Sequence, residues 1–276
     1  MSREDRQSAV TKHFDTHANV WSEYYEGIHE LSLRFLTRRR AVDALLGRIL
    51  AGGRTERAID LGCGTGSYLA VLARHAERVV GIDVAPAMIG QAATLSREST
   101  MTCALAVGSV LDLPLADASL DLAIGVGLLE YFDRPDLVIR EALRVLKPGA
   151  PFVFTLPHAL GISRVLGLPR TITLLLPARW RVALGRLRDR LLGRTPDPSK
   201  YYLGEAYTRT RLHRLCHRAG ATIVATAVSG YEVSHIGGVP VSSRIGAAIG
   251  QWLEPLRDSA PARYVGNNLL VAVTKI

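Results

Sequence analysis

Two periods of hydrophobicity alternate along the chain, and together they predict an α/β protein. Short and nearly unbroken apolar runs indicate parallel strands that are covered on both faces. These runs lie at residues 57–61, 78–82, 102–107, 121–126 and 151–156. Between them the apolar residues follow helical spacing, as in Pro135–Leu146, which stops at a Lys-Pro-Gly signal. Two later runs, 222–228 and 268–274, predict the last strands of the sheet.

Longer segments flank this alternating core. Residues 11–50 predict helices, and their second half has apolar spacing with Arg38, Arg39 and Arg40 expected on the opposite, polar side. Residues 232–266 form a longer link than a hairpin between the last two strands needs, and we expect a helix near Ile245–Leu253. No internal repeat is present, so the chain reads as one large α/β domain with insertions.

Candidate chemistry begins at the turn after the first strand. The strand ends in Asp60, and glycines follow at alternate positions before the helix-like stretch 67–74: Gly62, Gly64 and Gly66. Such a turn brings bare backbone against a nucleotide-like ligand. A dinucleotide fingerprint has the spacing G-x-G-x-x-G, so this pattern disfavours a nicotinamide dehydrogenase.

The acid-x-G-x-G-x-G pattern resembles motif I of the class I S-adenosylmethionine-dependent methyltransferases. The resemblance implies that the glycines admit the methionine part of the cofactor and that Asp60 helps to hold its amino group. Cys63 lies inside the glycine turn, where a small side chain fits, and it belongs to the predicted cofactor site. The second strand also ends in an acid, Asp83, whose two oxygens could accept both hydroxyls of a ribose. Val84 and Met88 follow it and could sandwich a flat purine.

Two further segments resemble this family. Residues 108–114 correspond to its G-D-A-x-x-L-P motif, and residues 120–127 correspond to its F-D strand, which adds Ser109, Val110 and Gly125 to the predicted cofactor site. The family commonly has an acid where this chain has Ser109, so a bond from the adenine amino group would be weaker here. For each residue alone, shaping a turn or capping a helix is the alternative interpretation. The agreement of the motifs in order and spacing favours cofactor binding.

The N-terminal segment resembles the start of quinone-biosynthesis and magnesium-protoporphyrin O-methyltransferases, which begin F-x-x-x-A-x-x-W/Y-x-x-x-Y. Phe14, Ala18, Trp21 and Tyr25 or Tyr24 match this spacing. The resemblance implies that the aromatics roof the methionine end of the cofactor and that Tyr24 contacts cofactor or substrate. Ordinary core packing of these aromatics is the alternative.

Charge is concentrated in one stretch. The chain carries a net charge of +9, and residues 158–220 hold 13 Lys or Arg against 3 Asp or Glu. At helical spacing, Trp180 falls on the same face as several leucines, and arginines fall on the other faces. Segment 170–194 is therefore predicted to form an amphipathic, cationic helix. It fits a lid over the active site or a peripheral contact with an anionic membrane.

Composition narrows the class of protein further. An apolar fraction of 48% excludes a disordered chain. The charged N-terminus has no apolar signal region, and no stretch of about 18 apolar residues is present. Three well-separated cysteines indicate neither a disulfide framework nor a metal site. We therefore expect a cytoplasmic protein without a bound metal. If segment 170–194 binds a membrane, the protein would be attached to its surface peripherally.

These observations predict a Rossmann-like, seven-stranded methyltransferase sheet, mostly parallel with an antiparallel last strand, helices on both faces and a basic helical insert after the fifth strand. The expected parts are an N-terminal helical cap (1–50), a cofactor-binding core (51–157), the basic insert or lid (158–204) and the C-terminal part of the core (205–276). The family resemblance implies S-adenosyl-L-methionine as cofactor and S-adenosyl-L-homocysteine as product.

The predicted reaction is methyl transfer to a small, lipophilic acceptor at oxygen. Such a transfer needs a base near the acceptor, and His158, at the tip of the fifth strand, is the first candidate. Glu130 and Tyr131, just beyond the fourth strand, are the second candidates. A nucleic-acid methyltransferase is one alternative, which the Gly-Leu-Leu-Glu-Tyr sequence after that strand disfavours. A non-catalytic cofactor-binding protein is the other. The sequence does not specify the acceptor or the oligomeric state.

Overall fold

The computed structural model of the chain describes residues 3–26, 32–98, 103–166, 206–233, 235–236, 239–256, 259 and 264–276. Most of the predicted insert, including segment 170–194, therefore lies outside the described residues, and the division of the chain into four parts stays a prediction. No described helix is long and apolar enough to cross a membrane.

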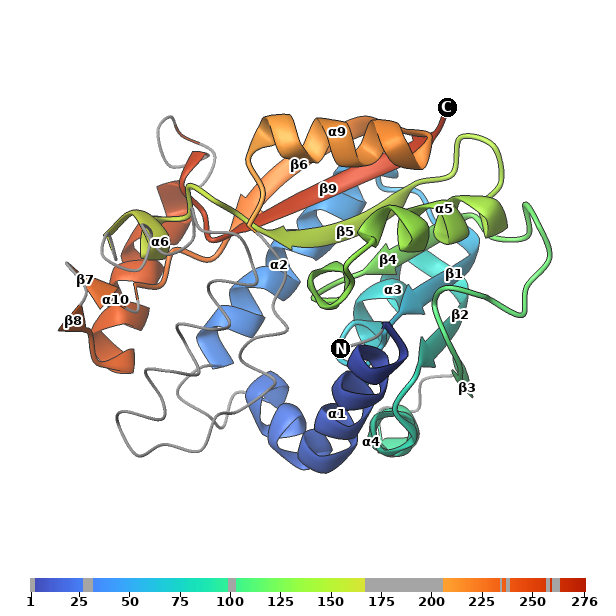
Figure 1. Cartoon of the computed structure of the whole chain (residues 1–276), viewed down its shortest axis with the longest axis horizontal. Helices are drawn as coiled ribbons and strands as arrows, with labels where there is room; N and C mark the ends of the chain where they lie inside the picture. The colour runs from blue at the N-terminus through green and yellow to red at the C-terminus, as the bar shows by residue number, and fades with distance from the viewer. Residues whose placement is uncertain are drawn as a thin grey trace.

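A seven-stranded sheet forms the centre of the molecule in the order β3-β2-β1-β4-β5-β9-β6 (Figure 1). The strands are β1 (Thr55–Leu61), β2 (Ala76–Asp83), β3 (Cys103–Val107), β4 (Leu122–Gly125), β5 (Phe152–Pro157), β6 (Ala221–Ser229) and β9 (Asn268–Lys275). The first five pair in parallel, and β9 runs antiparallel to both of its neighbours, β5 and β6. The predicted fold class is confirmed, including the antiparallel last strand.

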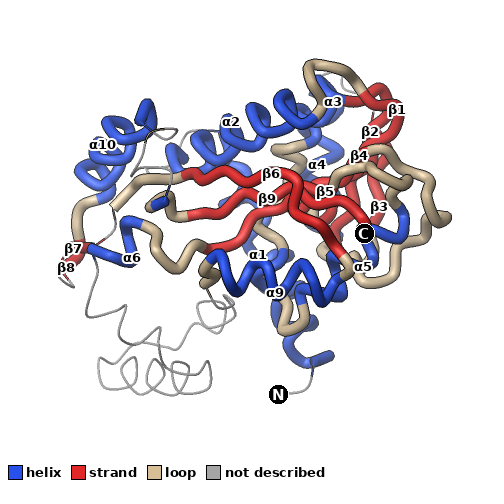
Figure 2. Tube along the Cα trace, turned by 90° about the horizontal axis from the view of Figure 1, so that it is seen from above, coloured by secondary structure: helices blue, strands red, loops and turns tan. Residues whose placement is uncertain are grey.

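The sheet is covered on both faces, as the unbroken apolar strands require (Figure 2). One face packs against α2 (Ser32–Ile49) and α3 (Leu69–His75), whose buried residues join those of β1 and β4 in one apolar cluster. The other face packs against α5 (Pro135–Val145) and α9 (Arg209–Ala219). In α5 the buried positions Val138, Ile139, Ala142 and Leu143 recur at helical spacing, so one stripe of the helix faces the sheet.

The remaining elements lie at the rims of the sheet. α1 (Arg3–Glu26) packs along α4 (Pro86–Glu98), and η1 (Leu129–Tyr131) follows β4. A short helix, α6 (Ile162–Leu166), follows β5. The long link between β6 and β9 contains a small hairpin, β7 (His235–Ile236) and β8 (Val239–Pro240), then α10 (Ser243–Leu253) and η3 (Glu254–Leu256). The sequence predicts α10 but not the hairpin, because two-residue strands leave no periodic pattern.

A hydrogen bond between neighbouring strands fixes the turn that leaves β4. The hydroxyl of Thr155 in β5 accepts a hydrogen bond from the backbone N–H of Gly127, at 2.8 Å, and Thr155 is buried. Gly127 has a φ of 70°, so this turn depends on a glycine and on a partner for its N–H. The turn directs residues 128–132 toward the carboxyl edge of the sheet.

Replacing Thr155 with valine should therefore destabilise the protein. Valine has nearly the same shape but no acceptor, so the half-buried Gly127 N–H loses its partner, which costs about 0.5–1.5 kcal/mol. Urea unfolding followed by circular dichroism measures the change. Thr155→Ser, which keeps the hydroxyl, is the matched control and should lose less stability; equal stability of Thr155→Val and the wild type would contradict this account.

Candidate active site

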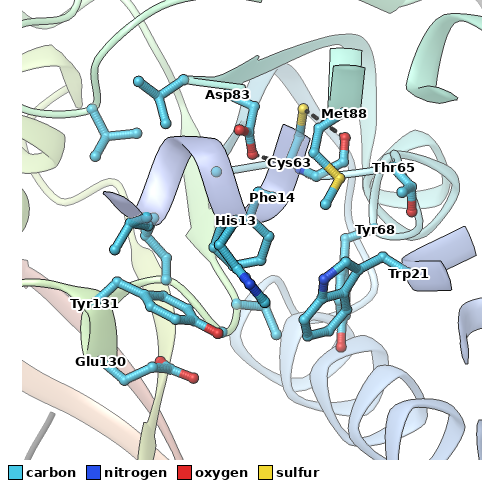
Figure 3. Close-up of a pocket in the computed structure, with 18 of the residues that line it drawn as sticks. His13, Phe14, Trp21, Cys63, Thr65, Tyr68, Asp83, Met88, Glu130 and Tyr131 are labelled. Carbon is cyan, nitrogen blue, oxygen red and sulfur yellow. Dashed lines mark hydrogen bonds between the residues drawn. The ribbon is translucent and has the colours of Figure 1, made fainter. Parts of the chain in front are cut away.

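A cavity of about 340 Å³ lies at the carboxyl ends of β1, β2 and β4, beneath α1 and beside α2 (Figure 3). Ligands of open α/β sheets bind at this edge, outside the carboxyl ends of the strands. The lining comes from the glycine turn, the ends of β2 and β4, the segment around η1, and the two N-terminal helices. One side is polar backbone and carboxylate, and the other is aromatic.

The glycine turn after β1 forms the polar floor. Gly62 and Gly64 have φ values of 65° and 54°, a left-handed conformation that side chains disfavour. A Cβ at Gly62 would lie 2.6 Å from Leu128 Cδ1, so a side chain there would force Leu128 to move. A Cβ at Gly64 would meet nothing within 4 Å, and this glycine lines the cavity. The backbone at Gly64 is thus open to a ligand.

Asp83 ties this turn to the end of β2. Its carboxylate accepts hydrogen bonds from the backbone N–H groups of Gly64 and Ala85, both at 2.9 Å. Burial raises the pKa of Asp83 above its ordinary value, although these two backbone N–H groups act in the opposite direction. Each carboxylate oxygen has a second acceptor site, so the pair of oxygens can also receive the two hydroxyls of a ribose.

Asp60 lies beneath the turn and is only 1% exposed. Its Oδ2 is a buried atom without a hydrogen-bond partner in the described structure. Burial raises the pKa of Asp60 well above its ordinary value, and the nearby charge of Asp83 raises it further. Burying a negative carboxylate without a nearby cation is unfavourable in free energy. In the protein alone, the charge of Asp60 is therefore not balanced.

Aromatic side chains from α1 and α2 cover the cavity. The Phe14 and Trp21 rings lie 5.6 Å apart between centroids, and Trp21 meets Phe35 edge-on at 5.8 Å. Phe14 also contacts Tyr131 of η1, at 5.2 Å between ring centroids. This continuous aromatic wall makes the upper part of the cavity apolar.

Polar contacts dock α1 onto α4. The Asp15 carboxylate accepts a hydrogen bond from the Ala87 backbone N–H at 3.0 Å, which satisfies a free donor in the first turn of α4. One turn further along, Gln91 Nε2 donates to Asn19 Oδ1 at 2.7 Å. These bonds set the height of the aromatic wall above the glycine turn.

Three polar side chains, those of His13, Glu130 and Tyr131, face the cavity on the side away from Asp83 (Figure 3). Glu130 and Tyr131 belong to η1, where the end of β4 directs them to the cavity, and His13 comes from α1. The sequence predicts the first two. His13 has no motif of its own; its place one residue before Phe14, which starts the aromatic pattern, is the available signal.

Arg38 and Tyr68 are cavity residues that the sequence analysis missed. Arg38 is only 6% exposed, and its Nε donates a hydrogen bond to the Tyr68 hydroxyl at 3.2 Å. Its guanidinium also lies over the Phe35 ring, 5.2 Å from the centroid. The prediction that Arg38 lies on the polar side of its helix is therefore wrong. Its register shows why: it stands three residues after Phe35 and four before Val42, both of them buried.

Most of the predicted cofactor residues are brought together at the cavity. Its lining includes Gly62, Cys63, Gly64, Asp83, Val84, Met88, Ser109 and Val110. Asp60, Gly66 and Gly125 are outside this lining, and Asp60 is buried behind it. A Cβ at Gly66 would crowd Ala92 of α4 at 3.1 Å, and one at Gly125 would crowd Phe152 at 3.2 Å, so both serve close packing. The side chain of Tyr24 lies outside the described residues.

The structure does not bring His158 to the cavity. Its side chain is 2% exposed, and its Nδ1 lies 2.9 Å from the Gly266 carbonyl oxygen in the segment before β9. Burial lowers its pKa, and Arg164 and Arg209 lower it further. This position favours a role in holding the loop after β5 to residue 266 over the role of a base.

The comparisons with known proteins agree with this geometry. Residues 59–154 match the family Methyltransf_11, described as a methyltransferase domain. The chain contains a class I methyltransferase domain. S-adenosylmethionine is the cofactor of this domain, as its sequence motifs predict. Three features of the site suit a ligand with a cationic end and a ribose. They are the buried oxygen of Asp60, the open backbone at Gly64, and the Asp83 carboxylate, which accepts two backbone hydrogen bonds.

Two curated relatives share part of the chain. It is 35% identical to the ubiquinone/menaquinone biosynthesis C-methyltransferase UbiE of Rubrivivax gelatinosus over 149 residues, which is 53% of this chain and 52% of the relative. It is 29% identical to a ubiquinone biosynthesis O-methyltransferase of Hahella chejuensis over 52% of this chain and 59% of the relative. The matches thus span little more than half of these relatives.

A solved structure matches over nearly the whole chain. The magnesium protoporphyrin IX methyltransferase of Synechocystis PCC 6803, with bound S-adenosylhomocysteine, has a TM-score of 0.61 at 14% identity. The match covers 98% of this chain and 100% of that one. At this identity the likeness concerns the fold, which includes the arrangement of the helical N-terminus and the C-terminal strands.

Replacing Asp60 with asparagine should change how stability depends on pH. The folded protein keeps the Asp60 proton to a higher pH than the unfolded chain does. The contribution of Asp60 to the free energy of unfolding therefore falls as the pH rises above about 4, by at most ~1.4 kcal/mol per pH unit. Asparagine does not titrate, so the free energy of unfolding of Asp60→Asn minus that of the wild type should increase from pH 4 to pH 7. Urea unfolding of the ligand-free protein measures it, and a constant difference would refute the buried-charge interpretation.

Proposed function

We propose that this protein transfers a methyl group from S-adenosylmethionine to an oxygen atom of a small, lipophilic acceptor. The observation that carries the proposal is the division of one cavity into a carboxylate-lined floor and an aromatic roof, with Glu130 and Tyr131 on the side away from Asp83. The two curated relatives support the small-molecule class because both are named for quinone methylation. One is a C-methyltransferase and the other an O-methyltransferase, so the choice of oxygen is part of the proposal.

The floor would hold the cofactor. Asp83 accepts the ribose hydroxyls, while Val84 and Met88 pack against the adenine. Asp60 balances the amino group of the methionine part, which gives its buried carboxylate the cation that it lacks in the protein alone. Arg38, a buried cation on the same cavity wall, receives the carboxylate of the methionine part.

The bound cofactor supplies a methyl group on a positively charged sulfur, so the protein mainly aligns the acceptor and excludes water. The aromatic wall does both, because Phe14, Trp21 and Phe35 present flat apolar surfaces to a lipophilic ring. Glu130 takes the proton from the acceptor oxygen as the methyl group is transferred. Tyr131 orients the acceptor through its hydroxyl, and His158 holds the loop after β5.

Two other functions make different predictions. A nucleic-acid methyltransferase would place label in RNA or DNA and bind it with strong salt dependence. A non-catalytic cofactor-binding protein would bind S-adenosylmethionine without transfer. The proposal also includes a cytoplasmic location. The earlier expectation that segment 170–194 acts as a lid or touches an anionic membrane lies outside the described residues and stays a prediction.

Calorimetry with two ligands tests the assignment of Asp83 and Arg38. S-adenosylhomocysteine has both the ribose and the methionine carboxylate, whereas 5′-methylthioadenosine has the ribose alone. Asp83→Ala should weaken the binding of both ligands by about 1.5–3 kcal/mol, the value of a hydrogen bond to a charged group. Arg38→Met should weaken only S-adenosylhomocysteine, by a similar amount.

The control for this experiment is Asp117→Ala. Asp117 pairs with Arg144 through a side chain that is 77% exposed, and it does not line the cavity. This variant should bind both ligands as the wild type does. Equal losses for the two ligands in Arg38→Met would remove Arg38 from the carboxylate site.

Methyl transfer itself is tested with labelled S-adenosylmethionine and a lipid extract of the cells that make the protein. The label should enter a lipophilic product at oxygen, and Glu130→Gln should reduce its rate at least ~100-fold because the base is lost. His158→Ala, after correction for its folded fraction, should retain transfer. Undiminished transfer by Glu130→Gln, or label at carbon, would contradict the oxygen mechanism.

A further inference from the structure

The outward face of α10 is apolar, and its inward face is made of glycines. A Cβ at Gly246 would overlap the Val233 carbonyl oxygen, and one at Gly250 would lie 3.0 Å from the backbone nitrogen of Glu232. The helix therefore packs its backbone directly on the chain before β7. The bulky side chains point outward: Trp252 is 73% exposed, and Ile245, two turns earlier on the same face, is 58% exposed.

Other exposed apolar side chains gather at this end of the molecule. Of the thirteen large apolar side chains that are exposed among the described residues, eight lie in segments 160–166 and 236–264. We name the α6–α10 surface after six of them: Val165, Leu166, Ile236, Ile245, Trp252 and Leu256. Figures 1 and 2 both place α6, β7, β8 and α10 at the same end of the molecule, and α6 contacts β7. A concentration of this kind marks a surface that meets another apolar phase.

The charges around this surface select the kind of partner. Arg244 is exposed in the first turn of α10, and the guanidinium of Arg164 in α6 is anchored to the His158 carbonyl oxygen at 2.8 Å. Within the described residues of segments 160–166 and 236–264, no acidic residue is exposed. Glu254 is the acid described there, and both of its carboxylate oxygens are buried. An apolar face with cations and no exposed acid is complementary to an anionic lipid surface.

We propose that the α6–α10 surface docks on an anionic lipid bilayer, with Trp252 in the headgroup layer. A tryptophan with apolar neighbours is typical of that depth. The position of the surface also suits a lipophilic acceptor: the arrow of β5 points toward α6 and α10 in Figure 1, so the surface lies at the same edge of the sheet as the cavity. Docking does not depend on methyl transfer, because it involves neither the cofactor nor the cavity.

Vesicle sedimentation with the full chain tests the proposal without cofactor or acceptor. The wild type should sediment with vesicles of equal parts phosphatidylcholine and phosphatidylglycerol, and much less with phosphatidylcholine alone. The triple variant Ile245→Ser, Trp252→Ser, Leu256→Ser should bind the anionic vesicles at least tenfold more weakly. Because the three side chains are exposed, the variant should keep its fold and its affinity for S-adenosylhomocysteine, which calorimetry checks separately.

The matched control removes three exposed apolar side chains elsewhere: Val107→Ser, Val224→Ser and Ile276→Ser, which are 55%, 51% and 77% exposed. This variant should bind the vesicles as the wild type does. The proposal is overturned if the wild type does not sediment with the anionic vesicles, or if the two triple variants lose binding equally. It is also overturned if light scattering shows a dimer that only the α10 variant disrupts, since the face would then join two copies of the chain.

Tryptophan fluorescence provides an independent readout of depth. Emission should shift to shorter wavelength when anionic vesicles are added, because Trp252 leaves water for the headgroup layer. Trp252→Phe keeps an aromatic anchor, so it should still sediment while losing most of this shift. An unchanged shift in Trp252→Phe would place a different tryptophan at the membrane and refute the assignment of this surface.

Discussion

The site depends on one carboxylate that holds two stretches of backbone together. Asp83 accepts a hydrogen bond from the glycine turn, at Gly64, and another from the start of the next loop, at Ala85. The turn itself is in a left-handed conformation that gains little from local propensity, so a partner on the neighbouring strand is needed to fix it. Because β1 and β2 are paired in register up to these residues, the sheet delivers the carboxylate to the turn.

The same arrangement creates an electrostatic imbalance. Asp60 and Asp83 are buried close enough for the charge of one to raise the pKa of the other, while the guanidinium of Arg38 lies at the α2 wall of the same cavity. In the protein alone this separation of buried charges is unfavourable. The proposed zwitterionic ligand with a ribose would relieve it, because its amino group and its carboxylate carry the opposite charges.

The sequence predicts the sheet well because its strands are buried on both faces and read as plain apolar runs. It predicts the floor of the cavity for a related reason: Gly62, Gly64 and Asp83 follow directly on strand ends, where local sequence determines position. The roof and the walls are different. Arg38 and Tyr68 are 30 residues apart in sequence, so their contact cannot be predicted from the residues around either of them.

His158 shows the converse limit of local reasoning. Its place at the tip of β5 is predicted correctly, yet the direction of its side chain is set by Gly266, more than a hundred residues later. The long link between β6 and β9 brings that carbonyl back to the end of β5. The position of His158 is thus set by its own strand, whereas the orientation of its side chain is set by a segment distant in sequence.

The position of β9 has a consequence for how the protein is made. It lies between β5 and β6, although it follows both along the chain. During synthesis, β6 has no neighbour in the sheet until Asn268–Lys275 have left the ribosome, and the edge of β5, which is made earlier, stays open for longer. The nascent chain therefore carries an unpaired strand edge on β5 for the time needed to translate about a hundred residues, and this edge can pair with other strands until β9 covers it.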